Sequence, residues 1–370
     1  MKKILVVYLG KKGAGPTYTY EMVKALIQTK QNVLVILSKY IENKNIWLDL
    51  NNNNLAQIYY IKTYRSKFEL IINSLNISTY IRINKIIKDF NPDIIYSTMV
   101  NIWNPIVFYL GRNVLIKIKT IHDPIPHIGE DDIFTKLLHK SEFKQIDKVV
   151  LLSRNSVKYA ISRGIKHENI IIIPHANFDY YRNSESHTTN EKLFNKILFF
   201  GRINEYKGLR YLLKAFILLQ KTHPHLKLVI AGEGDCSIFE KELNEIPNNF
   251  ELHNYWISDT MIHNLISEVD FLVLPYIDAS QSGVIPLAYT FSKPVIATNI
   301  GGIPEQVIDN YTGILVNPHS EYELLNAIKY LYENPMKIHE MGKNAYDYSQ
   351  NSLSWQNSAD ILIKSINESL

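Results

Sequence analysis

The chain has almost no cysteine: Cys236 is the single one among 370 residues. One thiol cannot form a disulfide within the chain, so we expect a fold held without one, as in the reducing cytoplasm. Nothing beside Cys236 in the sequence would activate it as a nucleophile. We therefore expect a buried or incidental thiol.

Long apolar runs are also missing. No stretch reaches the roughly 18 apolar residues that a membrane-spanning helix needs. The first residues, MKKILVVY, are basic, but their apolar run is too short for a secretory signal, and they are predicted to form a first strand. A hydrophobic content of 46% and a charged content of 21% are typical of a globular protein, and the length allows two domains with a core each.

Basic runs interleaved with aromatic residues are absent as well, and nucleic acid is not expected as a partner. Charge is nevertheless uneven along the chain. Residues 1–190 hold 26 Lys+Arg and 15 Asp+Glu, whereas the remainder holds 14 and 21, which gives the net charge of +4. A basic half favours an anionic partner, such as an acidic membrane surface or a lipid diphosphate, although ordinary solubilising charge is the alternative.

Apolar runs alternate with amphipathic segments along the whole chain. The predicted strands are Ile4–Tyr8, Val33–Ser38, Gln57–Ile61, Ile94–Ser97, Leu115–Ile121, Lys148–Ser153, Asn169–Ile173, Lys196–Phe200, Lys227–Ala231, Phe250–His253, Phe271–Leu274, Pro294–Ala297 and Gly313–Val316. Thr17–Thr29 is a predicted helix, and Lys67–Phe90 is a long amphipathic stretch. Strands of near-continuous Ile, Val and Leu between helical segments predict an α/β fold with parallel, doubly wound sheets.

A polar stretch, Asn183–Asn190, interrupts this alternation and is predicted to be a linker. We therefore expect a first Rossmann-like domain of residues 1–182, a linker of residues 183–192 and a second Rossmann-like domain of residues 193–350. The simplest arrangement has the two domains facing each other across a cleft. The amphipathic segment 351–370 ends the chain, with Trp355 as its expected anchor.

The segment after Phe271–Leu274 has the pattern of a ligand-binding edge. The strand stops at Pro275, a small polar loop runs from Ala279 to Gly283, and a helical segment begins at Val284. A strand, a glycine-containing loop and a helix N-terminus together present backbone N–H groups to an anion. Parallel α/β proteins without a phosphate ligand contain such loops too.

The stretch QSGVIPLAYTFSKPVIATNIGGIPE resembles the donor-binding segment of the family 4 glycosyltransferases, which have the two-domain GT-B fold. That family usually carries two glutamates in this loop, one for the donor sugar and one for the nucleotide ribose. Aligned on Gly283, they fall on Ser280 and Ala288, so both carboxylates are missing here. The resemblance implies donor contacts from Ser280, Gln281, Ser282, Gly283, Val284, Ile285 and Ala288. In an active enzyme with a variant pocket, Gln281 and Ser282 would make the sugar contacts.

Two segments of the second half strengthen the resemblance. Gly201-Arg-Ile-Asn-Glu-Tyr-Lys-Gly208 matches the family's GRxxxxKG segment. Arg202 would grip diphosphate oxygens bidentately and Lys207 would add a compact charge. The turn around Gly232 is similar to the one that closes the family's nucleoside pocket.

In the first half, Gly13, Gly15 and Pro16 stand between the first strand and the first helix. Small residues let a backbone approach a ligand closely. The stretch lacks the full dinucleotide fingerprint, so no NAD site is expected. The resemblance implies contacts from this loop to the donor diphosphate and to the acceptor, whereas a plain turn is the alternative.

The sequence HDPIPHIGE follows a predicted strand, on the edge where open α/β sheets bind ligands. The resemblance implies that His122 and Asp123 orient the donor sugar or the acceptor hydroxyl. His127, Glu130 and also His175 are expected nearby, with His127 and His175 on the acceptor side. A zinc site of His122, Asp123 and His127 is the alternative, but no helical HExxH spacing supports it.

The resemblance implies a retaining glycosyltransferase that needs neither a metal nor a cofactor. It would transfer a sugar from a nucleotide-sugar donor to the hydroxyl of a saccharide or lipid-linked acceptor, in bacterial surface polysaccharide synthesis. We expect a cytoplasmic protein, peripheral at the inner face of the membrane. Two alternatives stay open: a non-catalytic GT-B nucleotide-binding or assembly partner, which the missing glutamates favour, and a nucleotide-sugar epimerase, which would need cleft carboxylates.

Overall fold

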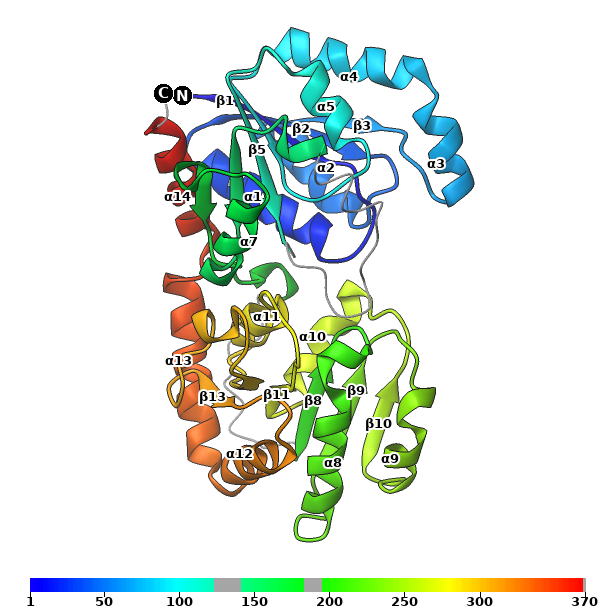
Figure 1. Cartoon of the computed structure of the whole chain (residues 1–370), viewed down its shortest axis with the longest axis vertical. Coiled ribbons are helices and arrows are strands. Elements are labelled where there is room, and N and C mark those ends of the chain that lie inside the picture. The colour runs from blue at the N-terminus through cyan, green and yellow to red at the C-terminus, as the bar shows by residue number, and fades with distance from the viewer. Residues whose placement is uncertain (123–140, 183–194, 369–370) are drawn as a thin grey trace. The chain divides into compact units, whose positions relative to one another are not determined.

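The computed structural model describes residues 1–122, 141–182 and 195–368 (Figure 1). They form two compact units, each built on its own parallel sheet. The first unit consists of residues 1–122, 141–174 and 355–368, and the second of residues 175–182 and 195–354. None of the helices in these ranges is long and apolar enough to cross a membrane.

The first unit has a seven-stranded sheet in the order β3-β2-β1-β4-β5-β6-β7. Its strands are β1 Lys3–Tyr8, β2 Asn32–Ser38, β3 Gln57–Ile61, β4 Ile94–Ser97, β5 Ile116–Ile121, β6 Lys148–Leu151 and β7 Ile170–Ile172. Its helices are α1 Ala14–Gln28, α2 Lys44–Asn52, α3 Lys67–Ser74, α4 Ile77–Phe90, α5 Asn104–Leu110, α7 Val157–Ser162 and α14 Trp355–Asn367, with 3-10 turns η1 Arg154–Ser156 and η2 His167–Asn169. The central strands are buried because helices cover both faces of a parallel sheet.

The second unit has a six-stranded sheet in the order β10-β9-β8-β11-β12-β13. Its strands are β8 Lys196–Phe200, β9 Lys227–Ala231, β10 Phe250–His253, β11 Phe271–Leu274, β12 Val295–Thr298 and β13 Gly313–Val316. Its helices are α8 Leu209–Gln220, α9 Glu240–Asn244, α10 Asp259–Ser267, α11 Val284–Thr290, α12 Glu321–Glu333 and α13 Pro335–Asn351, with 3-10 turns η3 Asp179–Tyr181, η4 Glu205–Lys207, η5 Ser237–Phe239 and η6 Ile303–Glu305. All the predicted strands are present, and the predicted architecture of two parallel-sheet α/β domains is confirmed.

The last helix, α14, returns to the first unit, as expected for the GT-B fold. It packs against α1, where the Trp355 ring meets the Tyr18 ring edge-on with 4.9 Å between centroids. Trp355 is 7% exposed, so the predicted anchor is in place. The returning segment starts at Trp355 rather than at residue 351, because Leu353 still belongs to the second unit and its carbonyl accepts a hydrogen bond from the Asn177 amide.

The boundary between the units lies at residues 174 and 175, earlier than the predicted end of the first domain at residue 182. The reason is packing. Phe178 and Tyr181 are buried in the core of the second unit, and the Phe178 amide donates to Thr290 Oγ1 at 2.9 Å. The predicted linker, residues 183–192, lies outside the described residues.

The amphipathic stretch from Lys67 to Phe90 forms two helices, α3 and α4. Asn76 separates them, since its extended backbone and its Oδ1, which accepts from the Ser78 amide, start a new helix. The first helix of the chain begins at Ala14, earlier than predicted, so Gly15 and Pro16 lie in its first turn.

Candidate donor site and the loops that form it

The strand order of the second sheet reverses between β8 and β11, which lie side by side (Figure 1). Open α/β sheets bind ligands at such a reversal, beyond the carboxyl ends of the strands. The loops that leave the two strands at this edge are residues 201–208 and residues 275–283. Both were predicted to bind the donor, and the structure brings them into contact.

The contact between the loops depends on Gly208. Its φ of +69° is in the left-handed region, and a Cβ there would lie 1.8 Å from the Pro275 carbonyl oxygen. Glycine alone accommodates both the dihedral angle and the close approach. A hydrogen bond of 2.9 Å from the Ile277 amide to the Tyr206 carbonyl completes the junction. The two loops therefore form one rigid edge.

Lys207 lies between two aromatic rings at this edge. Its Nζ is 3.8 Å from the centroid of the Tyr276 ring and 5.0 Å from that of Tyr206. A ring face attracts a cation through its quadrupole, which fixes the direction of the ammonium group. Tyr276 is buried, and its hydroxyl is 3.2 Å from Ser282 Oγ. One tyrosine thus connects the lysine of the first loop to the serine of the second.

Arg202 is exposed on the same loop, and its Nη2 donates to the Tyr206 hydroxyl at 3.2 Å. Tyr206 therefore supports both predicted cations of the segment. Burial raises the pKa of Tyr276 well above its ordinary value, so that phenol keeps its proton at neutral pH. Neither tyrosine was singled out from the sequence, because a buried aromatic residue is usually part of a core.

Gln306 holds the backbone of the second loop. Its Oε1 accepts from the Ser282 amide at 2.7 Å and its Nε2 donates to the Ser282 carbonyl at 2.9 Å. The Val284 amide donates to Ser282 Oγ at 3.2 Å. Among the amides of residues 283–285, those of Gly283 and Ile285 donate to no group in the described part of the chain. Anion binding by the amides beyond Gly283 stays a prediction.

The side chains of the second loop divide into two sets. Ser280 and Ser282 are each 3% exposed, and Gln281 Oε1 is buried without a hydrogen-bond partner in the described residues. Ala288 and the side chain of Ile285 differ from the prediction. Both side chains have no exposed surface and pack in the apolar core of the second unit, so Ile285 can meet a ligand only through its backbone amide.

His175 lies directly beneath this loop. A Cβ on Gly283 would be 3.2 Å from His175 Nε2, and the Nδ1–H group donates to the Ala176 carbonyl at 3.1 Å. The ring is 2% exposed. It was predicted on the acceptor side, but its burial makes it a support of the donor loop.

The other glycines of the second unit are required by the backbone. Gly201 and Gly232 have φ values of +129° and +146°, and a Cβ on Gly232 would lie 1.9 Å from the Gly201 carbonyl oxygen. Gly232 therefore lets the loops after β8 and β9 approach each other. Donor contacts from these two residues stay predictions.

In the first unit, the loop before α1 is filled by a tyrosine. A Cβ on Gly15 would lie 2.6 Å from Tyr8 Oη, so this glycine makes room for the Tyr8 ring. Gly15 and Pro16 are buried, whereas Gly13 is partly exposed and begins α1 with a φ of +94°. Gly13 thus keeps surface for a ligand, and Pro16 does not fit its predicted contact with the acceptor.

His122 follows β5, and its Nε2 donates to the Thr98 carbonyl at 3.1 Å. Tyr18 meets the imidazole edge-on at 4.5 Å. Thr98 Oγ1 is 2.7 Å from Thr19 Oγ1, which connects the end of β4 to α1. These residues surround the strand reversal between β1 and β4 of the first sheet. Asp123, His127 and Glu130 lie outside the described residues.

A buried ion pair includes Lys119, which lies on β5, the strand before His122. Lys119 Nζ and the Glu142 carboxylate are in contact, and both side chains have no exposed surface. Burial lowers the pKa of Lys119 and raises that of Glu142. A pair without exposed surface cannot reach a ligand, so we assign it to the core of the first unit.

Residues 182–348 match the family model described as Glycosyl transferases group 1. Over 184 residues the chain is 29% identical to the D-inositol 3-phosphate glycosyltransferase of Paenarthrobacter aurescens, with 47% of this chain and 44% of that protein aligned. The chain therefore matches less than half the length of this curated relative.

Solved structures resemble the whole chain. HepE of Anabaena in complex with UDP matches with a TM-score of 0.73 and 16% identity over 100% of both chains. UDP-GlcNAc 2-epimerase from Neisseria meningitidis matches with a TM-score of 0.61 and 12% identity over 99% of this chain and 100% of that one. At such identities the likeness shows the fold. Residues 182–348 thus have the sequence pattern of the group 1 glycosyl transferases, in a chain with the GT-B fold.

Proposed function

We propose that this protein is a glycosyltransferase that moves a sugar from a nucleotide-sugar donor to a hydroxyl acceptor. The observation that carries the proposal is the edge formed by residues 201–208 and 275–283, where Lys207 is held over Tyr276 beside the Ser282 loop. This edge lies at the strand reversal of the sheet and inside the segment that matches the group 1 family.

The edge has the groups that a leaving diphosphate requires. As the bond between the anomeric carbon and the diphosphate breaks, negative charge develops on the phosphate oxygens. Arg202, Lys207 and the amides of Gly283 and Ile285 would stabilise that charge. Preorganised donors of this kind contribute several kcal/mol in a site from which water is excluded. The acceptor oxygen forms the new bond, and its proton leaves with the departing phosphate.

Gln281 provides a sugar contact in place of the missing glutamates. Its Oε1 is buried and has no hydrogen-bond donor in the described residues. A buried acceptor without a partner costs free energy. Because Oε1 has no accessible surface, the Gln281 side chain has to turn toward the ligand before a sugar hydroxyl can donate to it. We propose that Gln281 receives this hydrogen bond, with Ser280 next to it.

The proposed donor is a UDP-sugar, the proposed reaction retains the anomeric configuration, and no metal takes part. The likeness to HepE in complex with UDP supports the nucleotide, and the resemblance of the donor loop supports the stereochemistry. The proposed acceptor is a lipid-linked saccharide of a surface polysaccharide, because an anionic acceptor fits the excess of basic residues among residues 1–190.

Donor binding is tested by melting the purified protein with a panel of nucleotide sugars. A ligand that binds the folded state alone raises the melting temperature. We expect UDP-sugars to do so, and Arg202→Ala or Lys207→Ala to remove the shift and to lower turnover about 10²–10³-fold. Arg163→Ala is the matched control, since Arg163 is an exposed arginine against a tyrosine ring in the first unit.

The two alternatives predict different outcomes of this test. A non-catalytic partner would bind the donor without consuming it, whatever acceptor is added. An epimerase would convert the donor without an acceptor. Binding of no nucleotide sugar at all would refute the glycosyltransferase and the epimerase, and would leave only an assembly partner.

A further inference from the structure

Helix α3 presents its apolar side chains to solvent. Phe68, Ile71 and Ile72, with Leu75 at the C-cap, recur at the spacing of one helix face, and their exposed fractions run from 50% to 76%. Among the eight residues of α3, Asn73 alone is buried within the structure described. The usual arrangement, with the apolar face of a helix on the core, is inverted here.

Polar contacts attach α3 to the rest of the first unit. Asn73 Nδ2 donates to the Thr63 carbonyl, and Ser74 Oγ accepts from Trp103 Nε1 at 2.8 Å. Side-chain hydrogen bonds fix the start of the helix, because the Glu69 amide donates to Ser66 Oγ at the N-cap and the Glu69 carboxylate accepts from the Arg65 amide. These polar contacts hold α3 in place without using its apolar face, and that face stays available to a partner.

The exposed stripe continues on α4. Ile77 and Ile81 are 71% and 64% exposed, and Lys85 and Lys88 extend the same helix face by one and two further turns. The opposite face of α4 is packed on the core of the first unit. Large apolar patches on an otherwise polar surface mark interaction sites.

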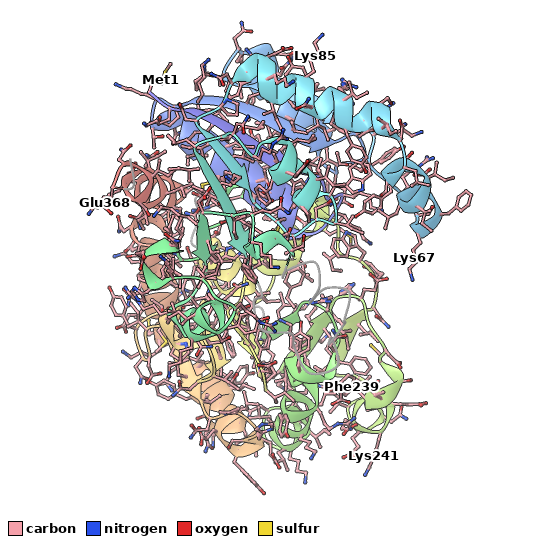
Figure 2. All side chains as sticks on the ribbon, turned by 45° about the horizontal axis from the view of Figure 1, so that its top comes forward. Met1, Lys67, Lys85, Phe239, Lys241 and Glu368 are labelled. Atoms are coloured by element: carbon pink, nitrogen blue, oxygen red, sulfur yellow. The ribbon has the colours of Figure 1, made fainter. Side chains whose placement is uncertain are left out.

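Positive charge surrounds this apolar stripe. Between residues 62 and 88 the chain has six Lys or Arg and a single acidic residue, Glu69, which is paired with Arg65. Lys67 and Lys85 extend away from the ribbon of α3 and α4 (Figure 2). Apolar side chains bordered by cations are the pattern of a surface that binds anionic lipid.

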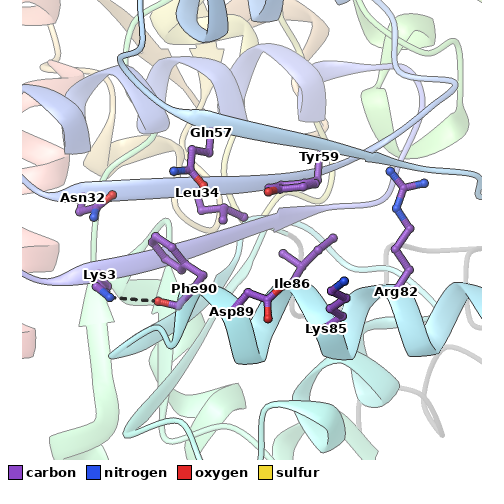
Figure 3. Close-up of a pocket in the computed structure, with 10 residues that line it drawn as sticks. All are labelled: Lys3, Asn32, Leu34, Gln57, Tyr59, Arg82, Lys85, Ile86, Asp89 and Phe90. Atoms are coloured by element: carbon purple, nitrogen blue, oxygen red, sulfur yellow. Dashed lines mark hydrogen bonds between the residues drawn. The ribbon is translucent and has the colours of Figure 1, made fainter.

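A groove beside α4 adds to this positive charge. It has a volume of about 650 Å³ and is lined by Lys3, Arg82 and Lys85, with Asp89 as its one acidic residue in the described structure (Figure 3). Three cations and one carboxylate favour an anion, and Lys85 belongs to both the groove and the exposed face of α4.

We propose that the exposed faces of α3 and α4 form a docking surface for a membrane that contains anionic phospholipid. The apolar side chains enter the boundary between headgroups and acyl chains, and the lysines and the groove contact headgroup phosphates. This proposal rests on the proposed function, because a lipid-linked acceptor lies in such a membrane. The docking surface would bring the enzyme to that acceptor.

The test is co-sedimentation of the full chain with vesicles of phosphatidylcholine, with or without phosphatidylglycerol. We expect binding to the anionic vesicles that weakens with salt. Ile71→Ser with Leu75→Ser should weaken it at least about tenfold for each side chain that loses its buried contact. Lys85→Glu with Lys88→Glu should weaken vesicle binding about fivefold for each lysine lost.

The matched controls are changes at exposed sites of the second unit. They are Tyr322→Ser with Met336→Ser for apolar area, and Lys221→Glu with Lys241→Glu for charge. Both controls should bind vesicles as the unchanged protein does. All the substituted side chains are exposed, so the melting temperature should not fall.

Three outcomes would overturn the docking surface. The unchanged protein binds no anionic vesicle, the Ile71 and Leu75 variant binds as well as the controls do, or this variant breaks a dimer in solution without changing vesicle binding. Failure of the proposed function is separate, because Arg202→Ala should lose the donor and keep the vesicles, and the α3 variant should do the reverse.

Discussion

At the scale of single residues, the candidate donor site depends on tyrosines that do not themselves carry charge. Tyr206 and Tyr276 are 3% and 1% exposed, and both lie against Lys207. A lysine has many rotamers, so holding its ammonium group in one place requires neighbours that reduce this freedom. The two tyrosine rings are these neighbours. The Tyr276 hydroxyl also contacts Ser282, so the same side chain joins Lys207 to the second loop.

Substitutions of Tyr276 separate the contribution of its hydroxyl group from that of its ring face. Tyr276→Phe removes the hydroxyl and should weaken donor binding about fivefold, as the loss of one hydrogen bond does. Tyr276→Leu also removes the ring face and should cost a further factor of about ten. Donor affinity measured by calorimetry checks this. Tyr289→Phe is the control, because that buried hydroxyl is bonded to Thr312 instead, and the idea fails if it changes affinity equally.

The sequence could indicate the charged residues of this site but not their supports. Arg202 and Lys207 stand in a recognisable segment, and a cation after a strand is a visible signal. Tyr276 and Gln306 resemble core and turn residues, and their contacts with Lys207 and Ser282 join segments far apart in the chain. Ala288 was misplaced for the related reason that alignment gives a position along the chain but not its burial.

At the scale of elements, strands were predictable because a parallel strand buried on both faces is an unbroken apolar run, as in β1 and β11. The break between α3 and α4 was not, because apolar residues continue through Leu75 and Ile77 and only Asn76 interrupts them. The exposure of the apolar face of α3 was not predictable either. Hydrophobic periodicity indicates that a helix has an apolar face, but not whether that face packs on the core or is exposed to solvent.

The junction of the two donor loops gives a prediction at this scale. Gly208→Ala adds a Cβ that must avoid the Pro275 carbonyl, so it should lower the free energy of unfolding by more than the roughly 1–2 kcal/mol of a left-handed residue and should impair donor binding. Gly164→Ala is the matched control: its φ is +90°, but its Cβ would meet nothing within 4 Å. Urea denaturation measures the free energy of unfolding of each variant, and donor titration measures its affinity for the donor. Equal effects of the two variants would contradict the proposed junction.

At the scale of the whole molecule, the chain passes from the first unit to the second at residues 174 and 175, and returns at residues 354 and 355. The first unit is therefore completed by the last residues of the chain. Its helix α1 is covered by α14, which is separated from α1 by the entire second unit in sequence. Two buried residues on either side of the return pack in different units: Leu353 in the core of the second, and Trp355 against Tyr18 in the first.

This arrangement predicts that substitutions two positions apart destabilise different units. Trp355→Ala removes the ring that packs on Tyr18 and should cost the first unit about 3–5 kcal/mol. Leu353→Ala removes a side chain from the core of the second unit and should cost that unit about 2–5 kcal/mol. Hydrogen exchange resolves where amide protection is lost: in β1 and β4 for Trp355→Ala, and in β11 and β12 for Leu353→Ala. If either variant weakens both sheets equally, the units unfold as one, and the return of the chain at Trp355 is not a boundary of stability.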